Sequence, residues 1–150
     1  MKQTVFFDMD NVLVDFKSGI DHLDDNTRSE YDGRLDEVPG IFALMKPMDG
    51  AIESVYKISE KMDTFILSTA PWLNPSAWSD KVMWIQHYFG ADENSLFYKK
   101  VFITHHKDLV IGDYLIDDRR KWGADRFSGE FIHFGSERFP DWNSITDYLI

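Results

Sequence analysis

The ten residues from Val5 to Val14 read VFFDMDNVLV, an apolar stretch interrupted by two carboxylates, Asp8 and Asp10, one residue apart. An apolar run of this kind is typical of a buried strand, and a buried parallel strand delivers its carboxyl end to the ligand-binding edge of an open α/β sheet. Two carboxylates held so close repel each other unless a cation or a shared proton intervenes. The stretch therefore predicts a functional site that needs a metal ion.

The composition of the 150-residue chain narrows the classes of protein to which it can belong. Its 43% hydrophobic residues, 12 Phe among them, are enough for the core of one domain and argue against disorder. The net charge of -10 argues against an extended grip on a nucleic acid polymer, although a bound cation still allows a small phosphorylated ligand. The lack of cysteine excludes disulfides, thiolate metal sites and cysteine nucleophiles.

The sequence has no pattern that indicates a membrane segment. No apolar run approaches the ~20 residues that span a bilayer, and Met1–Thr4 leads straight into the first predicted strand without the pattern of a signal peptide. We therefore expect a cytoplasmic protein without a membrane partner. The sequence leaves open whether the protein forms a homodimer.

Further strand and helix patterns alternate along the chain. Apolar runs predict strands at residues 64–67, 100–104, 114–116 and 130–134. Apolar spacings of three and four predict helices over residues 50–61, from Asn74 and Pro75 to a stop at Gly90, and over the last residues of the chain. This alternation predicts an α/β fold with a doubly wound parallel sheet and helices on both faces.

Residues 17–49 interrupt this alternation with a polar segment that carries only scattered apolar residues. Because it is too long for a simple loop in a compact domain, we expect it to contain helices of its own. We interpret it as a small cap inserted after the first strand. The chain is then one domain, with a core of about residues 1–16 and 50–150 and a cap of about 17–49.

The ends of the predicted strands carry polar side chains that a parallel sheet brings to one crevice. The set consists of Asp8, Asp10, Ser68, Lys107, Asp117 and Asp118. Carboxylates without thiolates favour a hard cation, Mg²⁺ before others. Lys107 and the Ser68 hydroxyl would then hold an anion bridged to that metal. These are the parts that phosphoryl transfer needs.

Four motifs in this order resemble the haloacid dehalogenase superfamily of aspartate-nucleophile phosphatases. They are DMDNVL at residues 8–13, Ser68 after a strand, Lys107, and IDD at residues 116–118. The resemblance spans the whole chain and implies that superfamily's Rossmann-like fold. It implies that Asp8 attacks phosphorus and forms an aspartyl-phosphate, while Asp10 protonates the leaving oxygen and later activates water.

The same resemblance implies how the phosphate and the metal are held. Ser68, Thr69 and Lys107 would bind the phosphoryl oxygens. Mg²⁺ would be bound by Asp8, by the backbone carbonyl of Asp10 and by Asp117, with Asp118 assisting from outside the direct ligands.

A narrower resemblance concerns the substrate. DMDNVLVDF at residues 8–16 is similar to the opening of the 5'(3')-deoxyribonucleotidases, which more often carry Gly where Asn11 stands, and Asn also tolerates a left-handed backbone. The ten-residue spacing from Lys107 to Asp117 is similar too. The implied substrates are deoxyribonucleoside 5'(3')-monophosphates. Phe16 matches a position that lines the family's base pocket, and Trp72 is added by its proximity to Ser68.

Other interpretations remain open on the residues alone. One is a phosphatase for another small metabolite such as a sugar phosphate, which only the pocket can separate. An alternative from a different class is a phosphate-accepting receiver module, which also clusters Asp, a hydroxyl and Lys on a doubly wound sheet. In a receiver, however, the acidic pair follows the first strand and the phosphorylated Asp ends a later strand, which is the reverse of the order here. A receiver also has no insertion like residues 17–49. Residues 119–121, which read RRK, are interpreted as the solvated start of a helix after Asp118.

Overall fold

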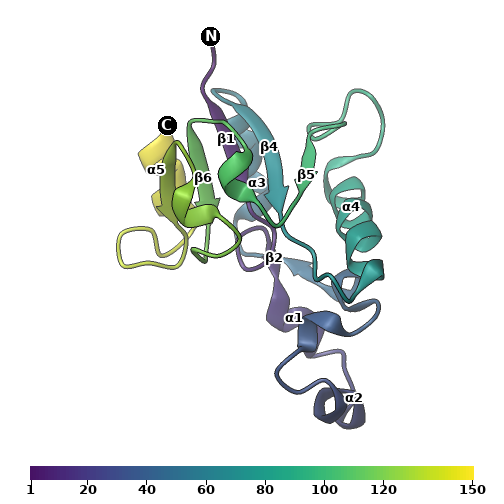
Figure 1. The fold of residues 1–150 in the computed structure, drawn as a ribbon. Coiled ribbons are helices and arrows are strands. Elements are labelled where there is room, and N and C mark those ends of the chain that lie inside the picture. The colour runs from purple at the N-terminus through teal and green to yellow at the C-terminus, as the bar shows by residue number, and fades with distance from the viewer.

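A computed structural model describes residues 1–150, and a five-stranded parallel sheet is its framework. The strands, in spatial order, are β5 (Val101–Ile103), β4 (Asp63–Ser68), β1 (Thr4–Phe7), β6 (Tyr114–Asp117) and β7 (Glu130–His133). The chain runs from β1 outward to β5 and then returns past β1 to β6 and β7 (Figure 1). This confirms the doubly wound α/β prediction and puts the reversal of strand order, where such sheets bind ligands, beside β1.

The two faces of the sheet are covered differently. Val5 and Phe7 point into the larger core, which is closed by three helices, α3 (Ala51–Ser59), α4 (Pro75–Phe89) and α5 (Trp142–Leu149). Phe6 points to the other face and packs in a smaller cluster with Leu115 and Phe127. Only short 3₁₀ helices, η3 (Lys107–Leu109) and η4 (Ala124–Arg126), lie in the connections on that side. The expectation of helices on both faces is wrong in this detail, because these two connections are short.

Helix α4 begins and ends where the sequence predicts. Pro75 is its first residue, and Gly90 follows its end with a φ of 98°. Asn74 occupies the N-cap position, but its side chain makes no capping hydrogen bond. Its side-chain oxygen instead accepts from the Ser76 hydroxyl at 2.6 Å, and its side-chain nitrogen donates to the backbone carbonyls of Asp36 and Val38, both at 3.0 Å. Asn74 therefore ties α4 to the inserted segment.

The inserted segment contains the helices expected of it. A short hairpin of β2 (Val14–Asp15) and β3 (Lys46–Pro47) joins it to the sheet domain. Between these strands lie α1 (Phe16–Ile20), α2 (Asp25–Glu30), η1 (Leu35–Glu37) and η2 (Ile41–Leu44). In Figure 1, α1 and α2 extend beyond the end of the sheet to which the strand arrows point, and both termini lie at the opposite end. No helix is long and apolar enough to span a membrane.

The turn from β1 into this segment depends on Asn11. Its backbone has a φ of 60°, in the left-handed region that Asn tolerates better than most side chains. The Asn11 amide donates to the Val14 carbonyl at 2.7 Å, and its side-chain oxygen accepts from the Phe16 amide at 3.3 Å. The chain is thereby turned immediately after Asp10, which leaves both acids at the strand end.

Candidate active site

Asp8, Asp117 and Lys107 meet in the interior at the carboxyl ends of β1 and β6. The Lys107 ammonium lies 3.0 Å from Asp8 Oδ1 and 2.7 Å from Asp117 Oδ2. All three residues are at least 94% buried, as the exposed fractions of 6%, 3% and 3% for Asp8, Asp117 and Lys107 indicate. Burial alone would favour neutral Lys107, but the two carboxylates outweigh it and raise the lysine pKa. The site therefore contains a buried, charged lysine between two acids.

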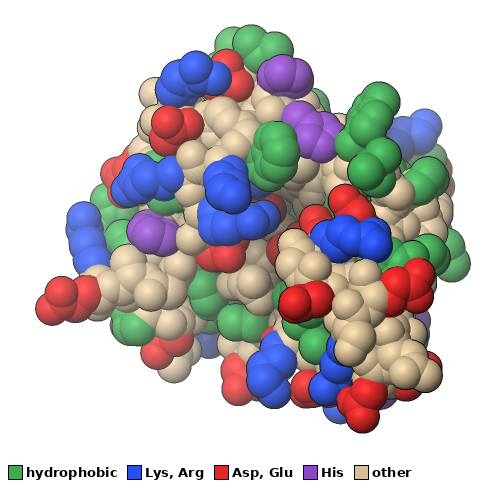
Figure 2. All heavy atoms as spheres, turned by 60° about the horizontal axis from the view of Figure 1, so that its bottom comes forward, with side chains coloured by type: hydrophobic (Ala, Val, Ile, Leu, Met, Phe, Trp, Pro, Cys, Tyr) green, Lys and Arg blue, Asp and Glu red, His purple; other side chains and the backbone are tan.

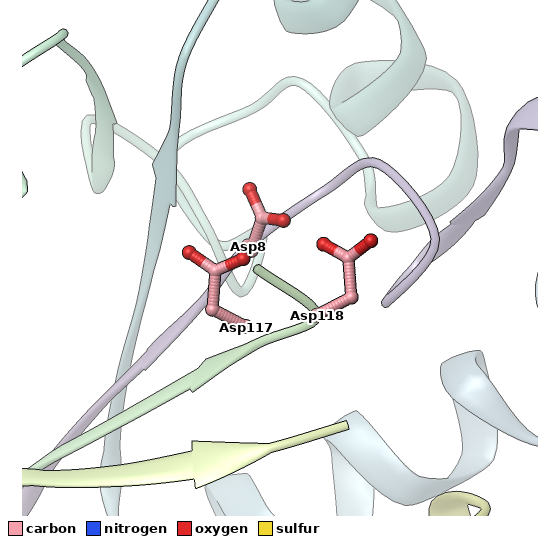
Figure 3. A group of neighbouring side chains, drawn as sticks. All are labelled: Asp8, Asp117 and Asp118. Atoms are coloured by element: carbon pink, nitrogen blue, oxygen red, sulfur yellow. The ribbon is translucent and has the colours of Figure 1, made fainter. Parts of the chain in front are cut away.

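Asp8, Asp117 and Asp118 form a cluster of carboxylates whose side chains face one another (Figure 3). One oxygen from each lies within 4.8 Å of the others. Burial, together with the charge of Asp8, raises the pKa of Asp117 to about 8 and that of Asp118 to about 6. The Oδ1 atom of Asp118 is buried without a hydrogen-bond partner. Crowded oxygen donors with one unsatisfied atom fit a hard divalent cation.

Asp8 behaves differently from its neighbours. Burial opposes its ionisation, but the positive charges of Lys107 and Lys81 outweigh burial and lower the pKa of Asp8. This carboxylate is therefore ionised at neutral pH, as a nucleophile has to be. The sequence interpretation kept Asp118 outside the direct metal ligands, whereas the structure groups its carboxylate with those of Asp8 and Asp117.

Lys81 is a site residue that the sequence analysis missed. Its ammonium lies 3.2 Å from Asp10 Oδ2, 2.9 Å from the Ser68 hydroxyl and 2.6 Å from the Thr69 carbonyl. The side chain is only 1% exposed, and its nitrogen lies 4.7 Å from the centre of the Phe42 ring. One signal could have identified it. Lys81 is three residues after Trp78 and four before Ile85, on the apolar stripe of α4, and a lysine buried there needs charged partners.

Asp10 is held by this lysine. Burial raises the pKa of Asp10 above its usual value, the charge of Lys81 opposes that rise, and the charge of Asp8 adds to it. Asp10 Oδ1 is buried without a hydrogen-bond partner. A carboxyl group with a raised pKa and a free oxygen is suited to exchange a proton with a ligand.

Ser68 and Thr69, the predicted phosphate-binding pair, are engaged in different ways. The Ser68 side chain is completely buried and accepts a hydrogen bond from Lys81. The Thr69 hydroxyl donates to the Thr104 carbonyl at 2.7 Å, so it supports the loop after β5. The Ser68 hydroxyl therefore shares the Lys81 ammonium with Asp10, whereas the Thr69 hydroxyl does not contact that ammonium.

Three cavities open beside Asp10. The face of the molecule in Figure 2 is hollowed, with acidic side chains in the hollow and Lys and Arg side chains around it. The smallest, about 10 Å³, adjoins Asp8 and Lys107. The largest, about 690 Å³, includes Trp72, and one of about 430 Å³ includes Phe16. The two residues predicted to contact a base thus line different cavities.

Arg119 and Trp122 line all three cavities. The interpretation of residues 119–121 as a helix start is wrong, because residues 119–120 are irregular and residues 121–123 form a turn before the short η4. The Arg119 amide donates to Asp117 Oδ1 at 3.1 Å, so the carboxylate that would cap a helix holds this turn. Arg119 and Lys121 thus border the site, whereas the Arg120 guanidinium lies over the Phe131 ring.

The fold is shared with a solved protein of known class. A haloacid dehalogenase-like family hydrolase from Xanthomonas campestris superposes with a TM-score of 0.58, over 99% of this chain and 90% of its own, at 10% identity. The chain therefore has the fold of the haloacid dehalogenase-like hydrolases, as the four motifs predicted.

Sequence similarity identifies the family within that class. Residues 34–143 match the family described as 5' nucleotidase, deoxy (pyrimidine), cytosolic type C protein. A Vibrio phage KVP40 protein, provisionally named a 5'(3')-deoxyribonucleotidase, is 53% identical over 99% of this chain and 85% of its own length. The human cytosolic-type 5'(3')-deoxyribonucleotidase is 26% identical over 94% of this chain and 77% of its own. The chain belongs to this nucleotidase family and is a phosphoric monoester hydrolase of the haloacid dehalogenase type.

Proposed function

We propose that this protein is a Mg²⁺-dependent phosphatase that hydrolyses deoxyribonucleoside monophosphates through an aspartyl-phosphate on Asp8. The observation that carries the proposal is the ionised Asp8, buried beside Lys107 and two residues before an Asp10 whose pKa is raised. The names of the phage and human relatives support the choice of deoxyribonucleotides. The human relative's name also supports a cytoplasmic location.

The first chemical step is the attack of Asp8 on phosphorus. A carboxylate oxygen forms the new bond to phosphorus while the bond from phosphorus to the ester oxygen of the sugar breaks. Lys107, 3.0 Å from Asp8, and the Ser68 hydroxyl donate to the phosphoryl oxygens, where negative charge is concentrated. Because these donors are buried, their attraction for the phosphate is little weakened by water.

Asp10 moves the proton in both steps. In its neutral form it gives a proton to the departing sugar oxygen, and the resulting carboxylate then takes a proton from the water that attacks the aspartyl-phosphate. Its raised pKa brings the neutral form needed at the start within easier reach than for an exposed aspartate. Lys81 fixes the Asp10 carboxyl group and the Ser68 hydroxyl through one ammonium, so the acid and a phosphate donor keep a constant separation.

A divalent cation fits the acidic cluster described above. Asp8, Asp117 and Asp118 would hold it with their carboxylates, and the resemblance adds the backbone carbonyl of Asp10. Mg²⁺ would supply positive charge that attracts phosphoryl oxygens and offsets the repulsion between phosphate and carboxylates. Oxygen donors alone, without thiolate or imidazole, favour Mg²⁺ over softer metals.

A phosphate-release screen tests this function. Ribo- and deoxyribonucleoside monophosphates, with the phosphate at 5' or 3', and a panel of sugar phosphates are each assayed with Mg²⁺ and with a chelator. We expect deoxyribonucleotides to be hydrolysed fastest, and the activity to disappear on chelation and return with Mg²⁺. A preference for a sugar phosphate would replace the proposed substrate. Phosphorylation of the protein without turnover would instead indicate the receiver-like module.

A further inference from the structure

Asp117 and Asp118 are consecutive residues, yet their carboxylates project to the same side, toward Asp8 (Figure 3). In an extended strand, successive side chains point to opposite faces of the sheet. Asp117 is the last residue of β6, so the backbone has to change direction at Asp118 before the two carboxylates can face each other. The contact that fixes the backbone at this point therefore also fixes where the Asp118 carboxylate lies.

His133 makes that contact from the neighbouring strand. Its Nε2 atom lies 2.9 Å from the carbonyl oxygen of Asp118, and because such an oxygen only accepts, Nε2 carries the proton and donates. His133 is the last residue of β7 and is paired in register with Asp117. The Phe134 amide donates to the Asp117 carbonyl at 3.0 Å, whereas the Asp118 carbonyl accepts from no backbone amide. The imidazole thus supplies the donor at the point where the backbone hydrogen bonds between β6 and β7 end.

Side chains also hold the segment that follows Asp118. The His133 ring is half-buried and lies 5.8 Å, centre to centre, from the ring of Phe131, which is two residues earlier and on the same face of β7. The Arg120 guanidinium lies over the Phe131 ring, 4.3 Å from its centre. Residues 118–120 have no regular secondary structure, so their course depends on such side-chain contacts.

The Asp118 carboxylate has no strong contact of its own that keeps it in the cluster. Its Oδ1 atom is buried without a hydrogen-bond partner. The ionised Asp8 repels it at a separation within 4.8 Å. Asp118 is only half-buried and the next residue, Arg119, is exposed, so an unrestrained backbone would let the carboxylate turn toward water. A restraint on the backbone is therefore what keeps this carboxylate facing the other two.

We infer that His133 is a positioning residue of the candidate metal site: its hydrogen bond to the Asp118 carbonyl keeps the Asp118 carboxylate beside Asp8 and Asp117. This inference rests on the proposed metal-dependent function, because the cluster is the place proposed for Mg²⁺. Groups that orient metal ligands from outside typically change metal affinity by about 10–100-fold. His133 acts through Asp118 and is not itself a ligand.

The test compares variants with and without a donor at position 133. His133→Phe keeps an aromatic ring against Phe131 but cannot donate, and His133→Gln restores a side-chain N–H. Glu130→Ala is the matched control, because it removes one side-chain hydrogen bond, from Tyr148 at 2.9 Å, at the opposite end of the same strand. Mg²⁺ affinity is measured by isothermal titration calorimetry for each variant, with and without the additional Asp118→Ala substitution.

We expect His133→Phe to weaken Mg²⁺ binding about tenfold, and to have no further effect once Asp118 is replaced, because the histidine acts only through that carboxylate. His133→Gln should recover most of the affinity, and Glu130→Ala should lose none. An equal loss with and without Asp118→Ala would reveal a general structural role and overturn the inference. Unchanged affinity in His133→Phe would overturn it as well.

The metal-free crystal structure of His133→Phe separates this inference from the proposed function. We expect the Asp118 carboxylate to leave the cluster, while Asp8 and Asp117 keep their contacts with Lys107. An unchanged Asp118 would overturn the inference even if the wild-type protein binds Mg²⁺. A wild-type protein that binds no Mg²⁺ would reject the proposed metal dependence, but a displaced Asp118 in the variant would still establish His133 as its positioning residue.

Discussion

The ammonium of Lys81 lies 3.2 Å from Asp10 Oδ2, and this ion pair joins the middle of α4 to the end of β1. The lysine is 1% exposed and also holds Ser68 and Thr69. Removal of one partner from a buried ion pair leaves the other charge uncompensated. Lys81 therefore has a positioning role: it sets where Asp10 meets the leaving oxygen, although it is not itself a proton donor in the reaction.

Replacement of Lys81 should impair the step that depends on the acid. We expect Lys81→Met to slow the first chemical step for a deoxyribonucleotide by about 10²-fold or more, the effect also expected of Asp10→Asn. Release of p-nitrophenol from p-nitrophenyl phosphate in a single turnover should slow far less, because that leaving group needs little protonation. Lys81→Arg should recover part of the rate. An equal loss with both substrates would indicate a structural role only.

Loss of Asp117 should weaken metal binding. We expect Asp117→Ala to lower the affinity for Mg²⁺ by about tenfold or more, measured by isothermal titration calorimetry, because the site loses one of its three facing carboxylates. Asp125→Ala, at an exposed acid in the neighbouring η4, is the control and should bind Mg²⁺ normally. Asp118→Ala should also weaken binding if its carboxylate is a direct ligand. Unchanged affinity in Asp117→Ala would remove the cluster from consideration as the metal site.

The carboxylate cluster also predicts how stability changes with pH. The pKa of Asp117 is raised to about 8 and that of Asp118 to about 6, both above the value of 3.8 for a free side chain. At a pH between 3.8 and these raised pKa values, the folded protein therefore binds more protons than the unfolded chain. Proton binding by the two carboxyl groups stabilises the folded state at low pH, and this stabilisation is lost as pH rises through the raised pKa values. Without metal, Tm should fall from about pH 5 to about pH 8. The rise in Tm caused by Mg²⁺ should grow over the same range, because the metal requires ionised ligands. A metal-free Tm that increases across this window would contradict both pKa shifts.

The backbone of Asn11 predicts an asymmetric response to substitution. Asn11→Gly should change the free energy of unfolding by less than about 1 kcal/mol, because Gly adopts the left-handed conformation freely and only the exposed hydrogen bond to Phe16 is lost. Asn11→Val should cost about 1–2 kcal/mol more, since its branched side chain disfavours that region. Urea denaturation compares the two variants. Equal stability of both would mean that the turn after Asp10 does not require this conformation.

Much of the fold and part of the site could be predicted because they depend on local patterns. The apolar runs at β1, β4 and β6 identify central strands, and parallel connections then bring the strand ends together. That is how Asp8, Asp117 and Lys107, far apart in the sequence, could be assigned to one site before their contacts were seen.

The features that could not be predicted from the sequence depend on tertiary contacts. A lysine in a helix normally lies in solvent, so Lys81 was overlooked although it lies on the apolar stripe of α4. Trp122 follows three basic residues in a segment without periodicity, and nothing local indicates its left-handed backbone or its place beside His105. Asn74 has the sequence of a helix cap, but its side-chain oxygen accepts from the Ser76 hydroxyl while its side-chain nitrogen donates to two backbone carbonyls of the inserted segment.

The most direct measurement of the central claim is chemical trapping of the covalent intermediate. The enzyme is mixed with a deoxyribonucleoside monophosphate and Mg²⁺, quenched, and reduced with borohydride, which converts an aspartyl-phosphate into homoserine. Mass spectrometry of the digested protein should then find homoserine at position 8, and Asp8→Asn should give neither homoserine nor phosphate release. Homoserine at position 10 or 117, or phosphate release that persists in Asp8→Asn, would contradict the assignment of Asp8 as the nucleophile.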